Sequence, residues 1–532
     1  MLVGRHKARR LTVILSVWLS GLTTFAPATA ATPARPPAAA APCTSDCFVL
    51  TGLTIDGVTA YPMAELAPLY ADELAREVGM ADLVAIAQRI TDKYRADGYF
   101  LTRAVVPRQA DVSGHARIRV YEGFVSEVAY EGDRASATAV KQLMGPVAGA
   151  KPLRLAEVDR RLALASDLPG VKVHTRLEPV LDDPAEHKLV VESKARRFTG
   201  SLYVDNRGAR SAGPWQAYGR GAMNSALRSG DQLSVGVLTT PADPKEFTQG
   251  EVAYSAPLRG GGQIRTSVSA SKAQTGSRAV NEFGNESRAF GLRLSIPVER
   301  RRDRSLWVAA GVDARRVEQN WMGGEAVDEL RVARVATHGD LTWRGGYSTG
   351  FLQVARGLDA FGATDSTSNR RSRRDADGQF WKVNAQASHY RDIGKRAGIY
   401  MAAEGQWADR PLLGSEEFSA GALPYGRGYN YGEIMGERGV AGQVELRTGW
   451  DPKLRPLTFF QAYTFLDGAK VWNENAAPGR KSAALSSAGV GLRLRFGDRM
   501  TVRMEAVKPL TRTPYDEGDK DWRPFVSISS AF

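Results

Sequence analysis

The sequence contains few cysteines, and it has no long apolar run after its first thirty residues. The only two cysteines, Cys43 and Cys47, are poor evidence for a zinc site, and no lipoprotein box precedes Cys43. No window of roughly eighteen apolar residues follows Ala30, which excludes a membrane protein built from spanning helices. A soluble protein and a β-barrel both remain, because barrel strands carry apolar residues only at every second position.

The scarcity of histidine argues against an enzyme. Of the six histidines, only His338 and His389 follow residue 198, and both lie in strand-like runs where a polar wall position is the simpler interpretation. No metal-ligand cluster or phosphate-binding loop stands out. We therefore expect no catalytic site, no metal and no cofactor.

The first thirty residues predict export from the cytoplasm. Four basic residues precede an apolar run of about a dozen, and Ala28-Thr-Ala30 offers a cleavage site, as is typical of a signal peptide over residues 1–30. Residues 31–47 form an Ala/Pro-rich leader. Because disulfides persist outside the cytoplasm, Cys43 and Cys47 are interpreted as a small disulfide loop. The net charge of +13 does not require a nucleic acid, which exported chains do not meet.

Two α+β modules in tandem are predicted after the leader. Residues 48–123 have the order strand, helix, helix, strand, strand, and residues 83–94 repeat apolar side chains at three- and four-residue spacing, which favours a helix. Residues 124–197 repeat that order, with helices near 135–145 and 155–167. The sequence therefore predicts a repeat of architecture in front of the longest segment.

From residue 198 to residue 532, long alternating segments replace helical periodicity. Residues 290–298 place Phe, Leu, Leu, Ile and Val on one face, and residues 440–450 and 488–496 alternate similarly. Such faces suit a wall between lipid and a wet lumen, although a soluble sandwich also has an apolar inward face. The lengths of the connections between strands favour a transmembrane antiparallel barrel of about sixteen strands. Short turns alternate with longer loops at 274–285, 318–328, 357–377, 408–438 and 472–482.

The chain ends in an alternating segment, residues 522–532, that closes with Phe532. A C-terminal aromatic on a last strand resembles the signal that the outer-membrane assembly machinery reads. We therefore expect Phe532 to act as an assembly signal, with that machinery as a partner during biogenesis and outer-membrane lipids around the finished barrel.

The layout after Phe48 resembles the two-partner-secretion transporters, the hemolysin secretion/activation family. The resemblance implies two POTRA domains in the periplasm, a sixteen-stranded barrel in the bacterial outer membrane, and a loop between strands eleven and twelve that folds back into the lumen. It also implies the function: recognition of an unfolded hemolysin- or adhesin-like (TpsA-like) exoprotein by the POTRA domains and its export through the barrel.

Two motifs carry this resemblance. Arg427-Gly428-Tyr429 resembles the family's Arg-Gly-Tyr/Phe motif of the lumenal loop, and Phe465-Leu-Asp467-Gly468 resembles its Phe-x-Asp motif on strand thirteen. The resemblance implies that Asp467 faces the lumen and accepts Arg427 in a desolvated, bidentate pair.

Two features fit the resemblance less closely. The family pattern commonly places Gly two residues after the Asp, where this sequence has Ala469. The loop from Asp365 to Asp377 carries Arg370, Arg371, Arg373 and Arg374, and a charge run in a long loop is usually solvated and mobile. We interpret that run as a solvated face.

The nearest alternative function is an assembly factor that inserts outer-membrane proteins or autotransporters. Such relatives usually carry three or more POTRA domains, whereas this chain has room for two. A passive pore or an adhesin is disfavoured, because neither would need tandem periplasmic modules.

Overall fold

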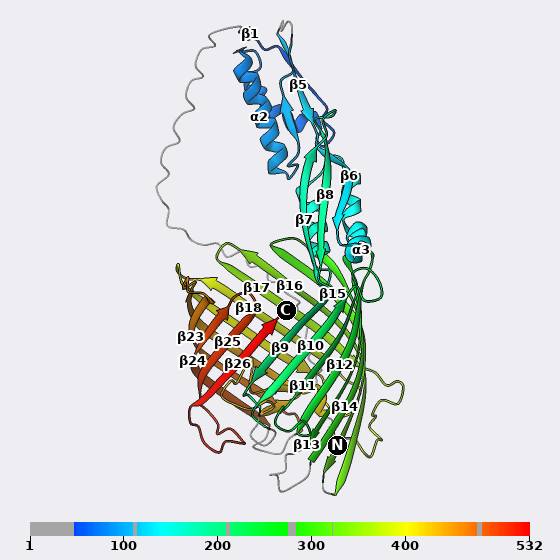
Figure 1. The fold of residues 1–532 in the computed structure, drawn as a ribbon, viewed down its shortest axis with the longest axis vertical. Helices are drawn as coiled ribbons and strands as arrows, with labels where there is room; N and C mark the ends of the chain where they lie inside the picture. The colour runs from blue at the N-terminus through cyan, green and yellow to red at the C-terminus, as the bar shows by residue number, and fades with distance from the viewer. Residues whose placement is uncertain (1–46, 110–113, 209–212, 275–282, 322, 476–480) are drawn as a thin grey trace, which may run out of the picture.

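The computed structural model describes residues 47–532, except 110–113, 209–212, 275–282, 322 and 476–480. The expected signal peptide, most of the leader and Cys43 lie outside the described residues. Two α+β units, coloured blue and cyan, stack end to end above a barrel (Figure 1). In the described part of the chain, no helix is both long and apolar enough to cross a membrane.

The first unit packs one long helix on a three-stranded sheet. Helix α2 (Met80–Ala96) forms because Leu83, Ile86, Ile90 and Tyr94 fall on one face, and all four are buried in the core. The sheet has the order β2-β5-β4, with β2 and β5 parallel. The remaining elements are β1 (Phe48–Val49), β2 (Gly52–Asp56), α1 (Met63–Leu66), β3 (Glu77–Val78), β4 (Arg103–Val105) and β5 (His115–Tyr121).

The second unit repeats this topology. Its sheet has the order β6-β8-β7, and its first and last strands again pair in parallel. Helices α3 and α4 occupy the two stretches in which the sequence predicts helices. The elements are β6 (Phe124–Gly132), α3 (Arg134–Met144), α4 (Leu155–Ser166), β7 (Val171–Pro179) and β8 (Glu186–Ala195).

Specific polar contacts join the three parts. Between the units, Arg154 Nη2 donates to Tyr99 Oη at 2.7 Å. At the barrel, Arg300 forms two 2.7 Å hydrogen bonds to the carboxylate of Asp167, and the Ala139 amide donates to Ser229 Oγ at 3.1 Å. The second unit is therefore docked on the barrel turns that face it.

Sixteen strands of the described residues close into one antiparallel barrel, and both ends of the barrel segment lie at the rim beneath the second unit (Figure 1). The strands are β9 (Phe198–Asp205), β10 (Gln216–Asn224), β11 (Gln232–Thr239), β12 (Phe247–Pro257), β13 (Gln263–Gln274), β14 (Phe283–Arg300), β15 (Arg304–Trp321), β16 (Gly324–Trp343), β17 (Gly346–Gly357), β18 (Trp381–Asp392), β19 (Ala397–Ala408), β22 (Arg438–Trp450), β23 (Leu457–Trp472), β24 (Ser482–Phe496), β25 (Met500–Pro509) and β26 (Arg523–Ala531).

The alternating segments have their apolar face outward. Phe290, Leu292, Leu294, Ile296 and Val298 on β14 are 38 to 54% exposed, as residues of a lipid-facing wall should be. The barrel closes where β26 pairs with β9 over a short register, from Ser527 opposite Asp205 to Ala531 opposite Ser201.

One expected loop is instead a hairpin. Strand β15 continues to Trp321 and β16 begins at Gly324, so most of residues 318–328 are paired strand. Both faces of this hairpin carry polar residues, which hide the alternation that a strand at membrane depth shows.

Candidate functional site

The link between β19 and β22, residues 409–437, is termed the lumen loop. It follows the eleventh strand of the barrel order and precedes the twelfth, and it contains the small hairpin β20 (Phe418–Ala420) and β21 (Ile434–Gly436). Its tip residues Tyr425, Arg427 and Tyr429 are all buried. Tyr425 and Tyr429 share an apolar cluster with residues of β23 and β24, so the loop packs on the wall of the barrel.

Arg427 lies among three carboxylates of the wall, Glu445, Asp467 and Glu505, which we term the acid site. Its Nη2 is 2.6 Å from Glu445 Oε1, its Nη1 is 3.1 Å from Glu505 Oε1, and its Nε is 3.4 Å from Asp467 Oδ2. The guanidinium also lies over the ring of Phe465, 4.1 Å from its centroid. Arg427 is only 3% exposed, so little water screens these charges.

The structure brings Arg427 and Asp467 together, but not in the bidentate geometry that was expected. Asp467 accepts the backbone amides of Gly426 at 3.0 Å and Arg427 at 3.4 Å, together with Ser487 Oγ at 2.5 Å. Within the described part of the chain, Arg427 Nε makes no hydrogen bond, despite its proximity to Asp467. Asp467 therefore fixes the backbone of the loop tip, and the side chain of Arg427 binds chiefly to Glu445 and Glu505.

The remaining motif residues hold the tip in place. The Gly428 amide donates to Ser487 Oγ at 3.2 Å, and Tyr429 Oη donates to the Ser486 carbonyl at 3.0 Å. On β23, Gly468 lies opposite Gly442 of β22. Ala469, where the family commonly has Gly, is buried in the cluster that holds Tyr425 and Tyr429, so the wall accommodates its methyl group.

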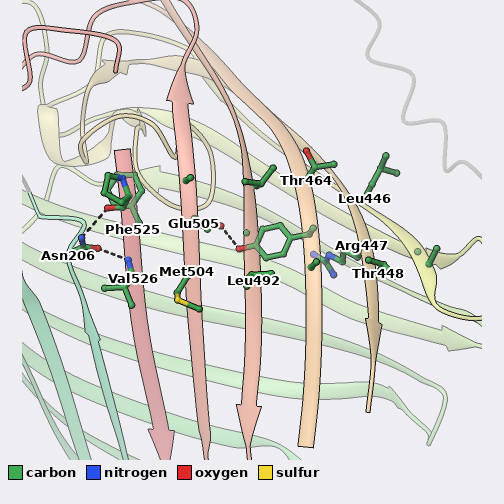
Figure 2. Close-up of a pocket in the computed structure, with 18 of the residues that line it drawn as sticks. Asn206, Leu446, Arg447, Thr448, Thr464, Leu492, Met504, Glu505, Phe525 and Val526 are labelled. Carbon is green, nitrogen blue, oxygen red and sulfur yellow. Dashed lines mark hydrogen bonds between the residues drawn. The ribbon is translucent and has the colours of Figure 1, made fainter. Parts of the chain in front are cut away.

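The sequence points to only part of the acid site. Alternation in residues 440–450 placed Glu445 on the polar face of its strand, but nothing local pointed to Glu505. Glu505 lies on β25 opposite Phe525 of β26 (Figure 2). Arg207, which follows β9, forms an ion pair with Glu505 and donates to the Arg427 carbonyl at 3.3 Å. The first and last parts of the barrel thus meet at the loop tip.

Figure 2 shows a shallow apolar hollow in this part of the wall. Its lining includes Leu446, Val490, Leu492 and Met504, and Leu446 and Val490 are among the exposed hydrophobic side chains. An exposed apolar lining suits contact with lipid chains rather than with a polar ligand.

The arginine-rich loop that follows β17 is solvated only in part. Arg370 and Arg374 are exposed, as expected, but the interpretation was wrong for the other two arginines. Arg371 donates to backbone carbonyls of its own loop, including that of Arg374 at 2.6 Å. Arg373 is 24% exposed and pairs with Glu417 and with Glu437, the latter at 2.6 Å. This loop therefore packs against the lumen loop.

The last two candidate features lie at the ends of the described chain. The Phe532 amide donates to the Gly200 carbonyl at 3.0 Å, and the Gly200 amide donates to the Phe532 carbonyl at 2.9 Å. Cys47 is disulfide-bonded. Because Cys43 lies outside the described residues, its pairing with Cys47 stays a prediction.

Comparisons with known proteins agree with this architecture. The family model described as haemolysin secretion/activation protein ShlB/FhaC/HecB matches residues 188–494, and a model of the ShlB-type POTRA domain matches residues 48–123. The heme/hemopexin transporter protein HuxB of Haemophilus influenzae (strain 86-028NP) is 22% identical over 86% of this chain and 82% of its own length. The outer membrane transporter CdiB of Escherichia coli is 24% identical over 85% and 77%, respectively.

Solved structures show the same fold. CdiB from Escherichia coli superposes with a TM-score of 0.75 at 23% identity, over 93% of this chain and 92% of that one. BamA from Haemophilus ducreyi, lacking POTRA domains 1-3, superposes with a TM-score of 0.54 at 14% identity, over 91% of this chain and 100% of that one.

The fold and the lumen loop define an outer-membrane barrel transporter with POTRA domains in the periplasm. The chain belongs to the haemolysin secretion/activation family, because the family model covers more than half of it. Members of that family are transporters rather than enzymes. This protein accordingly exports a partner exoprotein across the outer membrane, and the barrel end away from the two units faces the outside.

Proposed function

We propose that the lumen loop closes the export path and that the acid site holds it there until the partner exoprotein arrives. The observation that carries this proposal is the burial of Arg427 among Glu445, Asp467 and Glu505. Glu445 also pairs with Arg447 and Arg493, and Glu505 with Arg207, but Arg427 is the cation that the loop contributes, and out of water it is stable only beside these acids. Withdrawal of the tip would separate them, so the loop has one strongly favoured resting position.

The periplasmic units supply the docking step. We propose that they comprise residues 48–123 and 124–197, with the barrel from 198 to 532, and that they capture the unfolded exoprotein by adding it as a strand to an exposed sheet edge. The outermost strands are β2 and β4 in the first unit and β6 and β7 in the second. Main-chain hydrogen bonds at such an edge give affinity without requiring one client sequence.

Three smaller assignments complete the proposal. Phe532 acts as the signal for barrel assembly, and Cys43 pairs with Cys47 in a local loop. The protein has no enzymatic activity and needs no cofactor or nucleic acid. The alternative of an assembly factor is disfavoured, because the matching family model and the similar proteins HuxB and CdiB are described as secretion or transporter proteins.

Replacement of Arg427 tests the role of the acid site. Arg427→Ala leaves three acids crowded without the loop's cation, so we expect export to fall about tenfold or more while the barrel still assembles. Asp467→Ala should have a smaller effect, because Arg427 keeps Glu445 and Glu505. The double variant should be little worse than Arg427→Ala alone.

The measurement is partner protein in the medium, normalised to heat-modifiable folded barrel. Arg447→Ala is the matched control, because it removes a wall cation 2.7 Å from Glu445 without touching the loop. Unchanged export by Arg427→Ala, or an equal loss in the control, would refute the anchoring role.

A further inference from the structure

A carboxylate near the start of the lumen loop is buried against a different part of the wall. Glu416 belongs to the short helix η6 (Gly414–Glu416), and its side chain is 3% exposed. Its Oε2 lies 2.6 Å from Lys382 Nζ on β18, and its Oε1 lies 2.8 Å from Arg334 Nη2 on β16. A buried acid with two close cations forms a second charged contact between loop and wall.

The backbone of the loop is held at the same place. Lys382 Nζ donates to the Glu416 carbonyl at 2.9 Å, and Gln406 Nε2 on β19 donates to the same oxygen at 3.0 Å. Arg315 Nη1 on β15 donates to the Ser415 carbonyl at 3.3 Å. Donors from four wall strands therefore converge on two consecutive loop residues, as expected of a built site.

This second site differs from the acid site in position and in sign. Two residues of β19 mark the depth of the two sites. Ala408 lies opposite Lys382 of the second site, and Ala402 lies opposite Gln443, which is beside Arg427 of the acid site. Six residues along β19 correspond to about 20 Å at the rise of a strand. Near the end of the barrel where the lumen loop starts, the wall offers cations to an acid of the loop. Deeper in the lumen, the wall offers acids to a cation of the loop.

We propose that Glu416 is a second positioning residue of the lumen loop, with Lys382 and Arg334 as its basic site. Because the basic site and the acid site have opposite charges, the loop can bind the wall in only one position. A shifted loop would place Arg427 against Lys382 and Arg334, or Glu416 against the acid site, and like charges repel at either place. This inference rests on the proposed function only in taking the loop as the movable part.

Accessibility of the loop tests the proposal independently of export. Ser419, three residues after Glu416, has a buried Oγ without a hydrogen-bond partner among the described residues, so Ser419→Cys is a mild substitution there. Cys47 is disulfide-bonded and does not compete for the reagent. In intact cells, a membrane-impermeant maleimide should label Cys at position 419 slowly while the loop is seated.

Glu416→Gln in this background should speed the labelling about tenfold, because Lys382 and Arg334 lose their counter-charge. Glu474→Gln is the matched control: it removes the partner of Arg438, but both side chains are about one-third exposed, and an exposed pair contributes little. Labelling of Glu416→Gln at the parental rate, with folded barrel present, would overturn the proposal.

The wall side provides a second route if Glu416→Gln does not assemble. Lys382→Met should speed labelling as Glu416→Gln does, and Lys382→Arg, which keeps the charge, should stay near the parental rate. The double variant Glu416→Gln/Lys382→Met should be no faster than the faster single variant. Rates that multiply would show that the two residues do not act as a pair.

Export measured in the same strains separates this inference from the proposed function. Faster labelling with reduced export supports both. Faster labelling with normal export would leave Glu416 as a positioning residue and remove the lumen loop from the control of export.

Discussion

Arg427 is suited to its place because its guanidinium presents separate nitrogens to separate acids. Nη2 reaches Glu445 and Nη1 reaches Glu505. A lysine ammonium is a single point charge and cannot span two carboxylates in this planar fashion. The backbone of the tip must therefore hold one position accurately enough for both contacts.

Gly426 provides that backbone position. Its φ is +87°, and a Cβ there would lie 2.6 Å from Leu485 Cδ1, so Gly426→Ala combines strain with a clash. We expect this variant to lower export about tenfold with normal barrel assembly, as we expect of Arg427→Ala. Gly414→Ala in the same loop is the control, because a Cβ at Gly414 meets nothing within 4 Å. Equal export by the two variants would contradict the requirement for a tight tip.

At this scale the sequence predicts single residues better than their partners. Arg427 and Asp467 could be placed through family motifs, and alternation placed Glu445 on the polar face. Glu505 and Arg207 could not be found, because strand pairing around a closed barrel brings together segments about 300 residues apart. Glu416 gave no signal, because an acid in a loop is usually solvated.

At the scale of elements, the stability of the first unit depends on one buried acid, Glu122. Its carboxylate accepts the amides of Thr59 and Ala60 at 2.8 Å each and the hydroxyl of Tyr94 at 2.6 Å. Burial acts to raise the pKa of Glu122, but the hydrogen bonds from the Thr59 hydroxyl, the Tyr94 hydroxyl and the two amides outweigh burial and hold the pKa below its ordinary value near 4.5.

The direction of this shift predicts how stability depends on pH. A lowered folded-state pKa contributes stability that is complete above about pH 4.5 and is lost as pH falls through the folded pKa. We expect the protection of residues 48–123 against hydrogen exchange, corrected for the intrinsic exchange rate at each pH, to fall over that acid range in the full chain. Glu122→Gln should exchange faster at neutral pH and lack this acid step, whereas the exposed Glu65→Gln should match the parent. If the loss of protection at low pH persists in Glu122→Gln, a group other than Glu122 causes it.

The closing strand β26 carries the expected assembly signal, Phe532, and this role can be tested. Phe532 is 61% exposed, yet its main chain forms two hydrogen bonds with Gly200. Phe532→Ser keeps those bonds and removes only the aromatic ring, so we expect less heat-modifiable barrel but unchanged export per folded barrel. Phe198→Ser, at an exposed aromatic on β9, is the control. Equal amounts of barrel from the two variants would count against a specific assembly signal.

Elements were predictable from sequence where one face meets lipid and the other meets water. That contrast produced the alternation of β14, β22 and β24. It fails in the hairpin around residues 318–328, because polar residues such as Glu318, Gln319 and Asn320 occupy successive positions there. The loop from Asp365 to Asp377 misled for a related reason: charges that pair with another loop look, in sequence, like charges that face water.

In the whole molecule, the second unit lies between the first unit and the barrel and contacts both. Phe100 and Leu101 of the first unit pack against its core, and Arg154 bonds to Tyr99. On the other side, it meets the barrel through the Asp167–Arg300 pair and the Ala139–Ser229 bond. Removal of the first unit leaves these contacts with the barrel in place.

Deletion of residues 48–123 should consequently separate assembly from export. The contacts of Asp167 and Ala139 remain, and so does the closing strand with Phe532, so we expect heat-modifiable barrel within about twofold of the parent. Export should be lost, because the edges of the first sheet are no longer available to an unfolded client. The matched control is Arg154→Ala, which removes the bond to Tyr99 but keeps both units and should export. Normal export by the deletion would place client recognition in the second unit, and loss of the barrel would show that the first unit is needed for assembly.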